Sequence, residues 1–189
     1  VITYVLRDKF NQITFIERNK NGKNLISENL FFKKYHNKNS IIFNGIGFST
    51  QNQNRQKANL RFKKKGFVFN KIVSKNSFIY GKVNLGNGCQ ILNNVVLQPD
   101  CSIGDHTVIN TGSIIEHDVK IGKNCFIAPG TVICGNVTIE DNVYIGPKSC
   151  IASNIKIKKN SIIGAGSTVF KNIKTKTFYY NKKWKYWLL

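Results

Sequence analysis

Residues 102–125 read SIGDHT-VINTGS-IIEHDV-KIGKNC, and these four hexads share one pattern that decides the fold. The pattern runs without a break through fifteen hexads, from residue 78 to residue 167. The second place is always Ile or Leu, and the sixth is Val, Cys, Ser, Thr or Ile. The fifth place is Gly, Asn or Asp except in three hexads, which hold Lys82, His106 and Lys148 there.

Each place of the hexad has a physical role. The large second residue and the smaller sixth residue point inward from a short strand. The fifth residue turns a corner with positive φ, which Gly, Asn and Asp adopt at the least cost. A fixed hexapeptide period is the signature of a parallel β-helix, in which three hexads make one triangular turn. Residues eighteen apart then stack at about 4.8 Å. The sequence therefore predicts a mainly β protein with a β-helix of about five turns.

The 189 residues suffice for one repeat domain with a small appendage. We expect a small α/β domain over residues 1–73, the β-helix over residues 74–173 and a basic aromatic tail over residues 174–189. Within the first part we expect strands at 1–6, 13–16 and 40–45, and helices at 30–35 and 51–65, the second helix ending at Gly66.

The chain is strongly basic, with 29 Lys and Arg against nine Asp and Glu and a formal charge of +20. Such a charge attracts polyanions, but no nucleic-acid motif accompanies it, so we expect a solvated lysine-rich face and no nucleic-acid partner. Cys89, Cys101 and Cys125 fall on inward sixth places, which favours core thiols in a reducing cytoplasm. No signal-peptide pattern or membrane-spanning apolar stretch occurs in the sequence, so we expect a cytoplasmic protein.

The tail interleaves aromatic residues with lysines and ends in KKWKYWLL at residues 182–189. Two uses of this segment are open. It can pack on the end of the prism or on a neighbouring subunit, or it can make a weak contact with an anionic membrane surface.

His117 is the candidate catalytic residue. It holds the fourth place of its hexad, directly before the corner residue Asp118, and Gly135 stacks on it one turn later. The carboxylate can orient the imidazole and raise its basicity, as a general base requires. The glycine bares a backbone N–H that can act as an oxyanion donor. The spacing fits equally a surface histidine beside a corner aspartate.

A column of small residues stacks at another corner. It contains Asn110, Ala128, Gly146 and Gly164, and beside them run Thr111, Pro129, Pro147 and Ala165. Such a column either exposes backbone as a groove for an extended pantetheine arm or packs tightly against another subunit.

Several segments resemble the hexapeptide-repeat acyltransferases, and within them the bacterial branch of sialic acid O-acetyltransferases and nucleotide-aminosugar N-acetyltransferases. The resemblance covers residues 13–173. Its segments are Asn44-Gly45-Ile46-Gly47, Ile109-Asn110-Thr111 through Glu116-His117-Asp118, Ile121-Gly122, Ala128-Pro129, Gly135-Asn136-Val137, Ile145-Gly146 and Ile163-Gly164-Ala165-Gly166.

The resemblance implies a left-handed β-helix and a homotrimer that binds acetyl-CoA between neighbouring prisms, without a metal. It implies that His117 is the general base, that Asp118 raises its basicity and that Asn110 helps to hold the acceptor. We expect Phe126 to line the acceptor site as well, and the front domain to lie on the acceptor side. The groove for acetyl-CoA would be lined by Gly135, Pro147 and Ala165, and the small-residue column adds Gly146 and Gly164. The expected function is acetylation of a sugar for bacterial surface glycans, either on the nitrogen of a nucleotide-linked amino sugar or on an oxygen of sialic acid.

Three departures from the family pattern keep an alternative open. Phe126 stands where family members often carry a second histidine that contacts the acetyl group or the acceptor. No Gly-rich nucleotide loop precedes Val1, so either the sequence is truncated there or the acceptor is held differently. Residues 180–184 read YNKKW in place of the usual GNPAK. Phe126 and this changed tail favour the second hypothesis, a trimeric scaffold that no longer acetylates. A zinc lyase on the same prism would need three histidines at one site, and the three histidines here do not share a corner.

Overall fold

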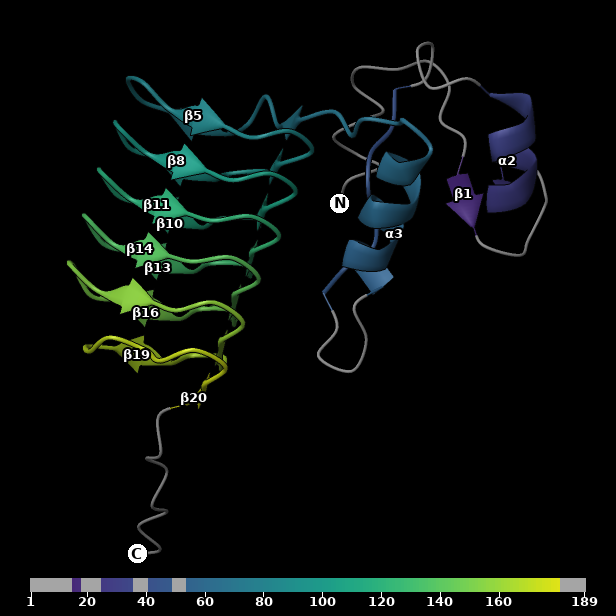
Figure 1. Ribbon diagram of the computed structural model, residues 1–189. Coiled ribbons are helices and arrows are strands. Elements are labelled where there is room, and N and C mark those ends of the chain that lie inside the picture. Colours follow the sequence, from purple (N-terminus) through teal and green to yellow (C-terminus); the bar gives the residue numbers. More distant parts are fainter. Residues whose placement is uncertain (1–14, 18–24, 36–40, 49–53, 181–189) are drawn as a thin grey trace, which may run out of the picture.

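The computed structural model describes residues 15–17, 25–35, 41–48 and 54–180. The strand predicted at 1–6 and the tail residues 181–189 lie outside the described residues. The repeat forms a prism of three parallel sheets, and a small front unit, whose described residues include two helices and two strands, lies beside the upper turns (Figure 1). The predicted mainly β architecture is confirmed.

The three sheets form the three faces of the prism, and every strand pair within them is parallel. Face 1 contains β4 (Phe78–Ile79), β7 (Val96–Leu97), β10 (Ile114–Ile115), β13 (Val132–Ile133), β16 (Cys150–Ile151) and β19 (Thr168–Val169). Face 2 contains β5 (Asn84–Leu85), β8 (Ser102–Ile103), β11 (Lys120–Ile121), β14 (Thr138–Ile139) and β17 (Lys156–Ile157). Face 3 contains β3 (Ile72–Val73), β6 (Gln90–Ile91), β9 (Val108–Ile109), β12 (Phe126–Ile127), β15 (Tyr144–Ile145), β18 (Ile162–Ile163) and β20 (Phe178–Tyr179).

The prism is longer at both ends than the fifteen hexads predicted, and it makes about six turns. At its start, β3 pairs with β6 although it lies within the range assigned to the front domain. At its end, β20 pairs with β18 although it lies within the range assigned to the tail. Because Ile162 pairs with Phe178, the last turn contains two residues fewer than the others. That shorter turn places the strand outside the hexad register.

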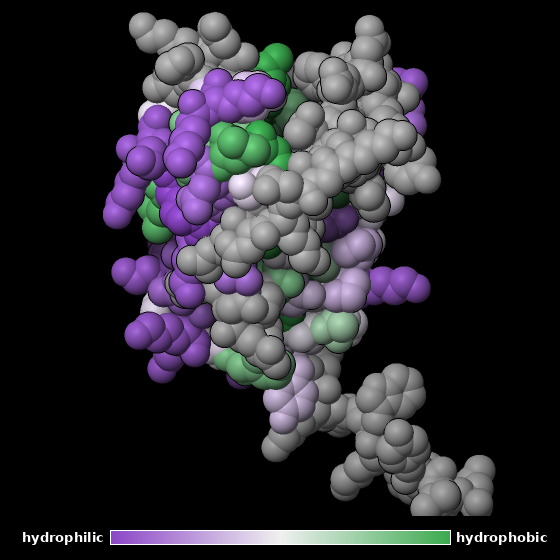
Figure 2. All heavy atoms as spheres, turned by 90° about the vertical axis from the view of Figure 1, so that its right-hand side faces the viewer, coloured by the Kyte–Doolittle hydropathy of each residue, from purple (hydrophilic) through white to green (hydrophobic). Residues whose placement is uncertain are grey.

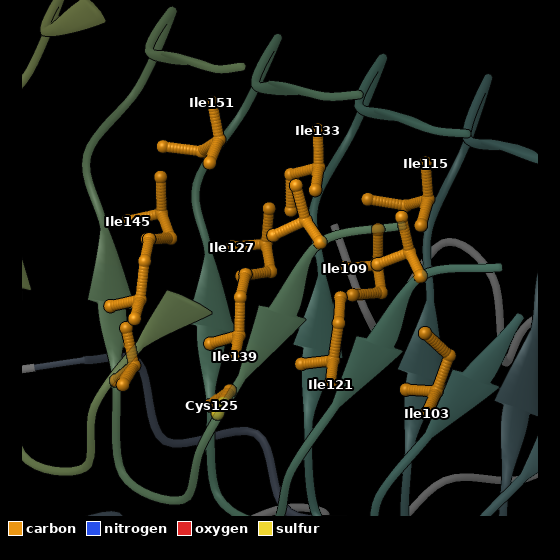
Figure 3. Packing of buried hydrophobic residues seen from close by; sticks show 14 of the residues in the cluster. Ile103, Ile109, Ile115, Ile121, Cys125, Ile127, Ile133, Ile139, Ile145 and Ile151 are labelled. Carbon is orange, nitrogen blue, oxygen red and sulfur yellow. The ribbon is translucent and has the colours of Figure 1, made fainter. Parts of the chain in front are cut away.

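The interior is a stack of the second-place side chains. Ile109, Ile127 and Ile145 stack on one face with no exposed surface, and the isoleucines of the other two faces meet them in the middle (Figure 3). Each fully buried side chain of this size contributes about 1.5–3 kcal/mol relative to exposure. The predicted core cysteines Cys89 and Cys125 are buried in the same cluster.

The corners follow the predicted rule closely. Every fifth place from Gly88 to Gly166 has positive φ, including His106 at 59° and Lys148 at 54°. In the first hexad Gly81 takes this conformation instead of Lys82. The left-handed corner is therefore imposed by the stacked turns, and it is kept even where the residue type is not the favoured one.

The front unit begins with the parallel strands β1 (Phe15–Glu17) and β2 (Leu25–Ser27). Its helices α2 (Glu28–Lys34) and α3 (Asn54–Lys64) confirm the two predicted helices, and Gly66 follows α3 with φ of 80°. The strand predicted at 40–45 is reduced to one isolated bridge between Ile42 and Phe69. The core of the unit is aromatic, because Phe31, Phe62 and Phe67 pack together.

Hydrophilic residues gather on the side of the front unit, around a smaller group of hydrophobic ones (Figure 2). The two helices and the turn after α3 contribute exposed lysines to this side, namely Lys33, Lys34, Lys57, Lys63, Lys64 and Lys65. Among the described residues, no helix has the length and hydrophobicity needed to cross a membrane.

Polar contacts join the front unit to the prism. Gln56 of α3 donates to Asn142 at 2.7 Å, and Asn59 donates to Asn124 at 3.5 Å. Both acceptors are corner residues between face 2 and face 3. Helix α3 therefore lies along this corner and makes hydrogen bonds to two corner asparagines, which stack one turn apart.

His106 lies at the same corner, between the prism and the front unit. The ring of Phe69 packs edge-on against it, and the guanidinium of Arg55 donates to its backbone carbonyl. The buried Nδ1 has no hydrogen-bond partner within the described residues. Burial lowers the pKa of His106; nearby Asp105 raises it, and the cations Arg55, Lys63 and Lys123 lower it further.

We predict that acid weakens the fold partly through His106. Because the folded pKa lies below the unfolded value of about 6.5, stability is full above that value and falls as the pH drops toward the folded pKa. His106→Asn keeps a residue that tolerates positive φ and does not titrate. Urea unfolding at several pH values between 5 and 7.5 should therefore show a smaller loss for this variant, and equal losses would contradict the prediction.

Candidate functional site

The predicted pair of His117 and Asp118 is formed. Nδ1 of His117 lies 2.8 Å from Oδ2 of Asp118, and both side chains are more than half exposed. Asp118 is a corner residue with φ of 60° between face 1 and face 2. The hydrogen bond to Asp118 raises the pKa of His117. With the proton on Nδ1, the free Nε2 is a base that faces outward.

Gly135 leaves the space that the imidazole occupies. A Cβ atom at this position would lie 2.7 Å from both Cε1 and Nε2 of His117, so a side chain there would displace the ring. The stacking of corner residues causes this approach, because Asn136 donates its N–H to the carbonyl of His117 at 3.0 Å. The predicted proximity of the histidine and the glycine one turn later is therefore present.

Some fourth-place N–H groups are paired within the chain: Asp105 accepts from Asn87 at 2.9 Å and Asp141 accepts from Lys123 at 2.7 Å. Others, such as those of His117 and Asp141, have no acceptor among the described residues. The N–H of Gly135 has no acceptor within the described part of the chain. A donor without a protein acceptor beside a base is the arrangement that stabilises a developing oxyanion.

The small-residue column lies at a different corner, between face 3 and face 1. Its members keep different degrees of exposure: Gly146 is buried, Asn110, Pro147 and Gly164 are half-buried, and Ala165 is exposed. A Cβ on Gly146 would lie 2.5 Å from the backbone nitrogen of Ala165. Close stacking of turns therefore accounts for Gly146 by itself, as it does for Gly104 at another corner.

One chain does not bring all the predicted site residues together. His117, Asp118 and Gly135 share one corner, whereas the column with Asn110 and Pro147 lies across face 1 from them. Phe126 is the first residue of β12 on face 3. His106 lies at its own corner, apart from His117, and His36 lies outside the described residues.

Two other kinds of chemistry find little support in the part of the chain that is described. No group of three or more His, Cys, Asp and Glu side chains gathers there as metal ligands. Burial raises the pKa of Cys125 to about 12 and that of Cys89 to about 11, so both thiols stay protonated at neutral pH and are poor nucleophiles.

An aromatic cluster on face 3 was not predicted from the sequence. Phe48 of the front unit stacks on Tyr144 with ring centroids 4.0 Å apart, and both rings lie near Phe126. Neither Phe48 nor Tyr144 carries a periodic signal that would mark it, because Tyr144 holds an outward first place and Phe48 lies outside the repeat. The position of Phe48 directly after the Asn44-Gly45-Ile46-Gly47 segment was the available hint.

The repeat matches a known family. Residues 82–116, 100–135 and 136–171 match the family model described as bacterial transferase hexapeptide (six repeats). The repeat region of this chain therefore resembles the bacterial transferase hexapeptide family, and the left-handed parallel β-helix expected from the resemblance is its fold. A comparison of the whole sequence with curated proteins finds no match.

Solved structures of several bacterial proteins share the fold over most of the chain. The acetyltransferase domain of PglB from Neisseria gonorrhoeae FA1090, in complex with acetyl coenzyme A, has a TM-score of 0.82 at 19% identity and covers 93% of this chain and 86% of that chain. WeeI from Acinetobacter baumannii AYE has a TM-score of 0.82 at 25% identity, with 93% and 89% covered. A variant of perosamine N-acetyltransferase from Caulobacter crescentus, in complex with CoA and GDP-perosamine, has a TM-score of 0.73 at 24% identity, with 80% and 71% covered.

Two glycine substitutions should separate the site from the scaffold. In Gly135→Ala the new methyl group meets the end of an exposed side chain that can turn away, so we expect a change in stability within about 0.5 kcal/mol. In Gly146→Ala it meets backbone, and overpacking should cost about 1–3 kcal/mol. Melting temperatures measure the difference, and the ring resonances of His117 should shift in the first variant alone. Equal destabilisation by both variants would show that Gly135 is merely a packing residue.

Proposed function

We propose that this protein is an acetyltransferase that moves the acetyl group of acetyl-CoA to the amino group of a nucleotide-linked sugar used in bacterial surface glycans. The observation that carries the proposal is the exposed His117–Asp118 pair, which faces Gly135 and its unpaired N–H on a transferase-type hexapeptide prism. Complexes of the PglB domain with acetyl coenzyme A and of the perosamine N-acetyltransferase variant with CoA and GDP-perosamine support the choice of donor and acceptor.

In the proposed reaction His117 acts as the general base. Asp118 holds the Nδ1–H, so that Nε2 accepts a proton as the acceptor amine attacks the thioester carbonyl. The N–H of Gly135 donates to the oxygen that becomes negative during this attack. When the C–S bond breaks, the imidazolium returns its proton to the departing thiolate, which leaves as CoA. The amide product forms without a covalent enzyme intermediate, and the buried cysteines take no part.

A homotrimer would complete the site. Face 1 lies between the His117 corner and the small-residue corner, so packing face 1 toward a threefold axis sets the His117 corner of one copy beside Asn110, Pro147 and Ala165 of the next. The outward residues of face 1 favour this arrangement, because Val96, Ile114, Val132 and Cys150 are largely apolar and half-buried. The equivalent places of face 2 include the exposed residues Asn84, Lys120 and Lys156. Acetyl-CoA would lie in the column with Gly146 and Gly164, between the two copies.

Replacing His117 tests the proposed mechanism. His117→Ala should lower the turnover number by about 10² or more, since general base catalysis contributes about 10²–10⁴-fold, while calorimetry should show unchanged binding of acetyl-CoA. Release of CoA thiol and the mass of the acetylated sugar measure the reaction. Wild-type protein that binds no acetyl-CoA and acetylates no amino sugar would leave the scaffold hypothesis standing, and transfer to sialic acid alone would refute the amino acceptor.

The trimer has its own test. Sedimentation equilibrium should give three times the chain mass of 21.5 kDa. Ile114→Lys should shift the protein toward the monomer and abolish activity, because it places a charge on the apolar part of face 1. Ile114 faces outward and is not a core residue, so the melting of the isolated prism should change little. An active monomer would contradict the shared site.

A further inference from the structure

The aromatic cluster on face 3 joins two parts of the chain that are far apart in sequence. Phe126 and Tyr144 are paired residues on the neighbouring strands β12 and β15. Phe48 arrives from the front unit and stacks on Tyr144 at 4.0 Å, with an angle of 16° between the rings. Its centroid lies 5.9 Å from that of Phe126. Phe48 is 38% exposed, so a substantial part of its ring remains open to a ligand.

The segment that presents Phe48 is held from both sides. The side chain of Gln90 on face 3 donates to the carbonyl of Asn44 at 2.7 Å. The guanidinium of Arg55 donates to the carbonyls of Asn44 and Ile46, at 3.0 and 2.7 Å. The amide of Asn44 bonds to Asn59 of α3. These contacts hold Asn44 and Ile46, so the segment that leads to Phe48 has polar anchors that do not depend on the ring.

The cluster lies at the edge of the part of face 3 that the front unit covers. Above it, Gln90 and Val108 are buried beneath the front unit, with 1% and 2% of their surface exposed. Below it, Phe178 is 61% exposed. Two residues after Phe126 and Tyr144 come Ala128 and Gly146 of the small-residue corner. The rings therefore form a wall between the front unit and the corner where the donor is proposed to lie.

We infer that Phe48 is an acceptor-binding residue, and that its open ring packs against the apolar face of the acceptor while the donor occupies the other side of the wall. This inference rests on the proposed function. In the proposed trimer the His117 corner of the neighbouring copy faces this wall, so an acceptor between them would lie within reach of the base. One face of the Phe48 ring stacks on Tyr144. The remaining surface of the ring can pack against a nucleobase or against the apolar C–H face of a sugar.

A plain packing role for Phe48 predicts different behaviour. If the ring only fastened the front unit to the prism, its loss would loosen the unit and change every kinetic constant together with the melting temperature. An acceptor contact changes the acceptor constant alone. The split between the KM for the acceptor and the KM for acetyl-CoA therefore distinguishes the two roles.

The experiment compares Phe48→Ala with Phe48→Tyr and with Phe178→Ala, which removes another exposed ring of face 3 farther along the prism. In Phe48→Ala we expect the KM for a nucleotide-linked amino sugar to rise about tenfold, as loss of one aromatic contact of about 1.4 kcal/mol produces. The KM for acetyl-CoA and the melting temperature should stay at the wild-type values. Phe48→Tyr should restore the acceptor KM, and Phe178→Ala should leave it unchanged.

An unchanged acceptor KM in Phe48→Ala, or an equal rise in both KM values, would overturn the inference while leaving the proposed function intact. Wild-type protein that transfers no acetyl group to any amino sugar would instead overturn the proposed function, and this inference with it.

Discussion

The left-handed corner at every sixth residue is the constraint on which the rest of the structure depends. It fixes the turn at eighteen residues, and it thereby decides which side chains stack. The Cβ-free position of Gly135 lies over His117 because both hold the fourth place of hexads three apart. The corner also selects residue types, since Asp and Asn tolerate positive φ better than most. Asp118 meets this backbone requirement, and the same short carboxylate reaches back to the imidazole beside it.

An adjacent histidine and aspartate occur twice in the repeat, at places of the hexad that differ, and the two pairs have different environments. In Asp105-His106 the histidine is the corner residue, and the aspartate before it accepts a backbone hydrogen bond from Asn87 and lies 3.5 Å from Lys123. The imidazole of His106 is left half-buried against Phe69, and its pKa is lowered. In His117-Asp118 the order is reversed, so the histidine projects into solvent with a raised pKa. The hexad register, and not the composition of the pair, separates an interface residue from a candidate base.

The sequence predicted the features that the register controls. The inward isoleucines, the corners and the approach of Gly135 to His117 all follow from counting in sixes and eighteens, and the structure confirms them. The sequence could not reveal the shortened last turn to Phe178, because that turn departs from the eighteen-residue period. Nor could it show that Gln90, at an outward place, is buried under the front unit. Contacts between the repeat and a segment without a period, such as Phe48 on Tyr144, have no signature in either part alone.

The geometry of the prism also explains why a single copy is an incomplete enzyme in the proposed reaction. A triangular helix carries its regular spacing along three edges, and two edges are separated by the full width of a face. A base on one edge and a groove on another can therefore meet only across an interface between copies. Three prisms around an axis, as in the proposed trimer, would bring unlike edges together three times. A shared site of this kind would give a reason for the apolar outward residues of face 1, which a solitary prism does not need.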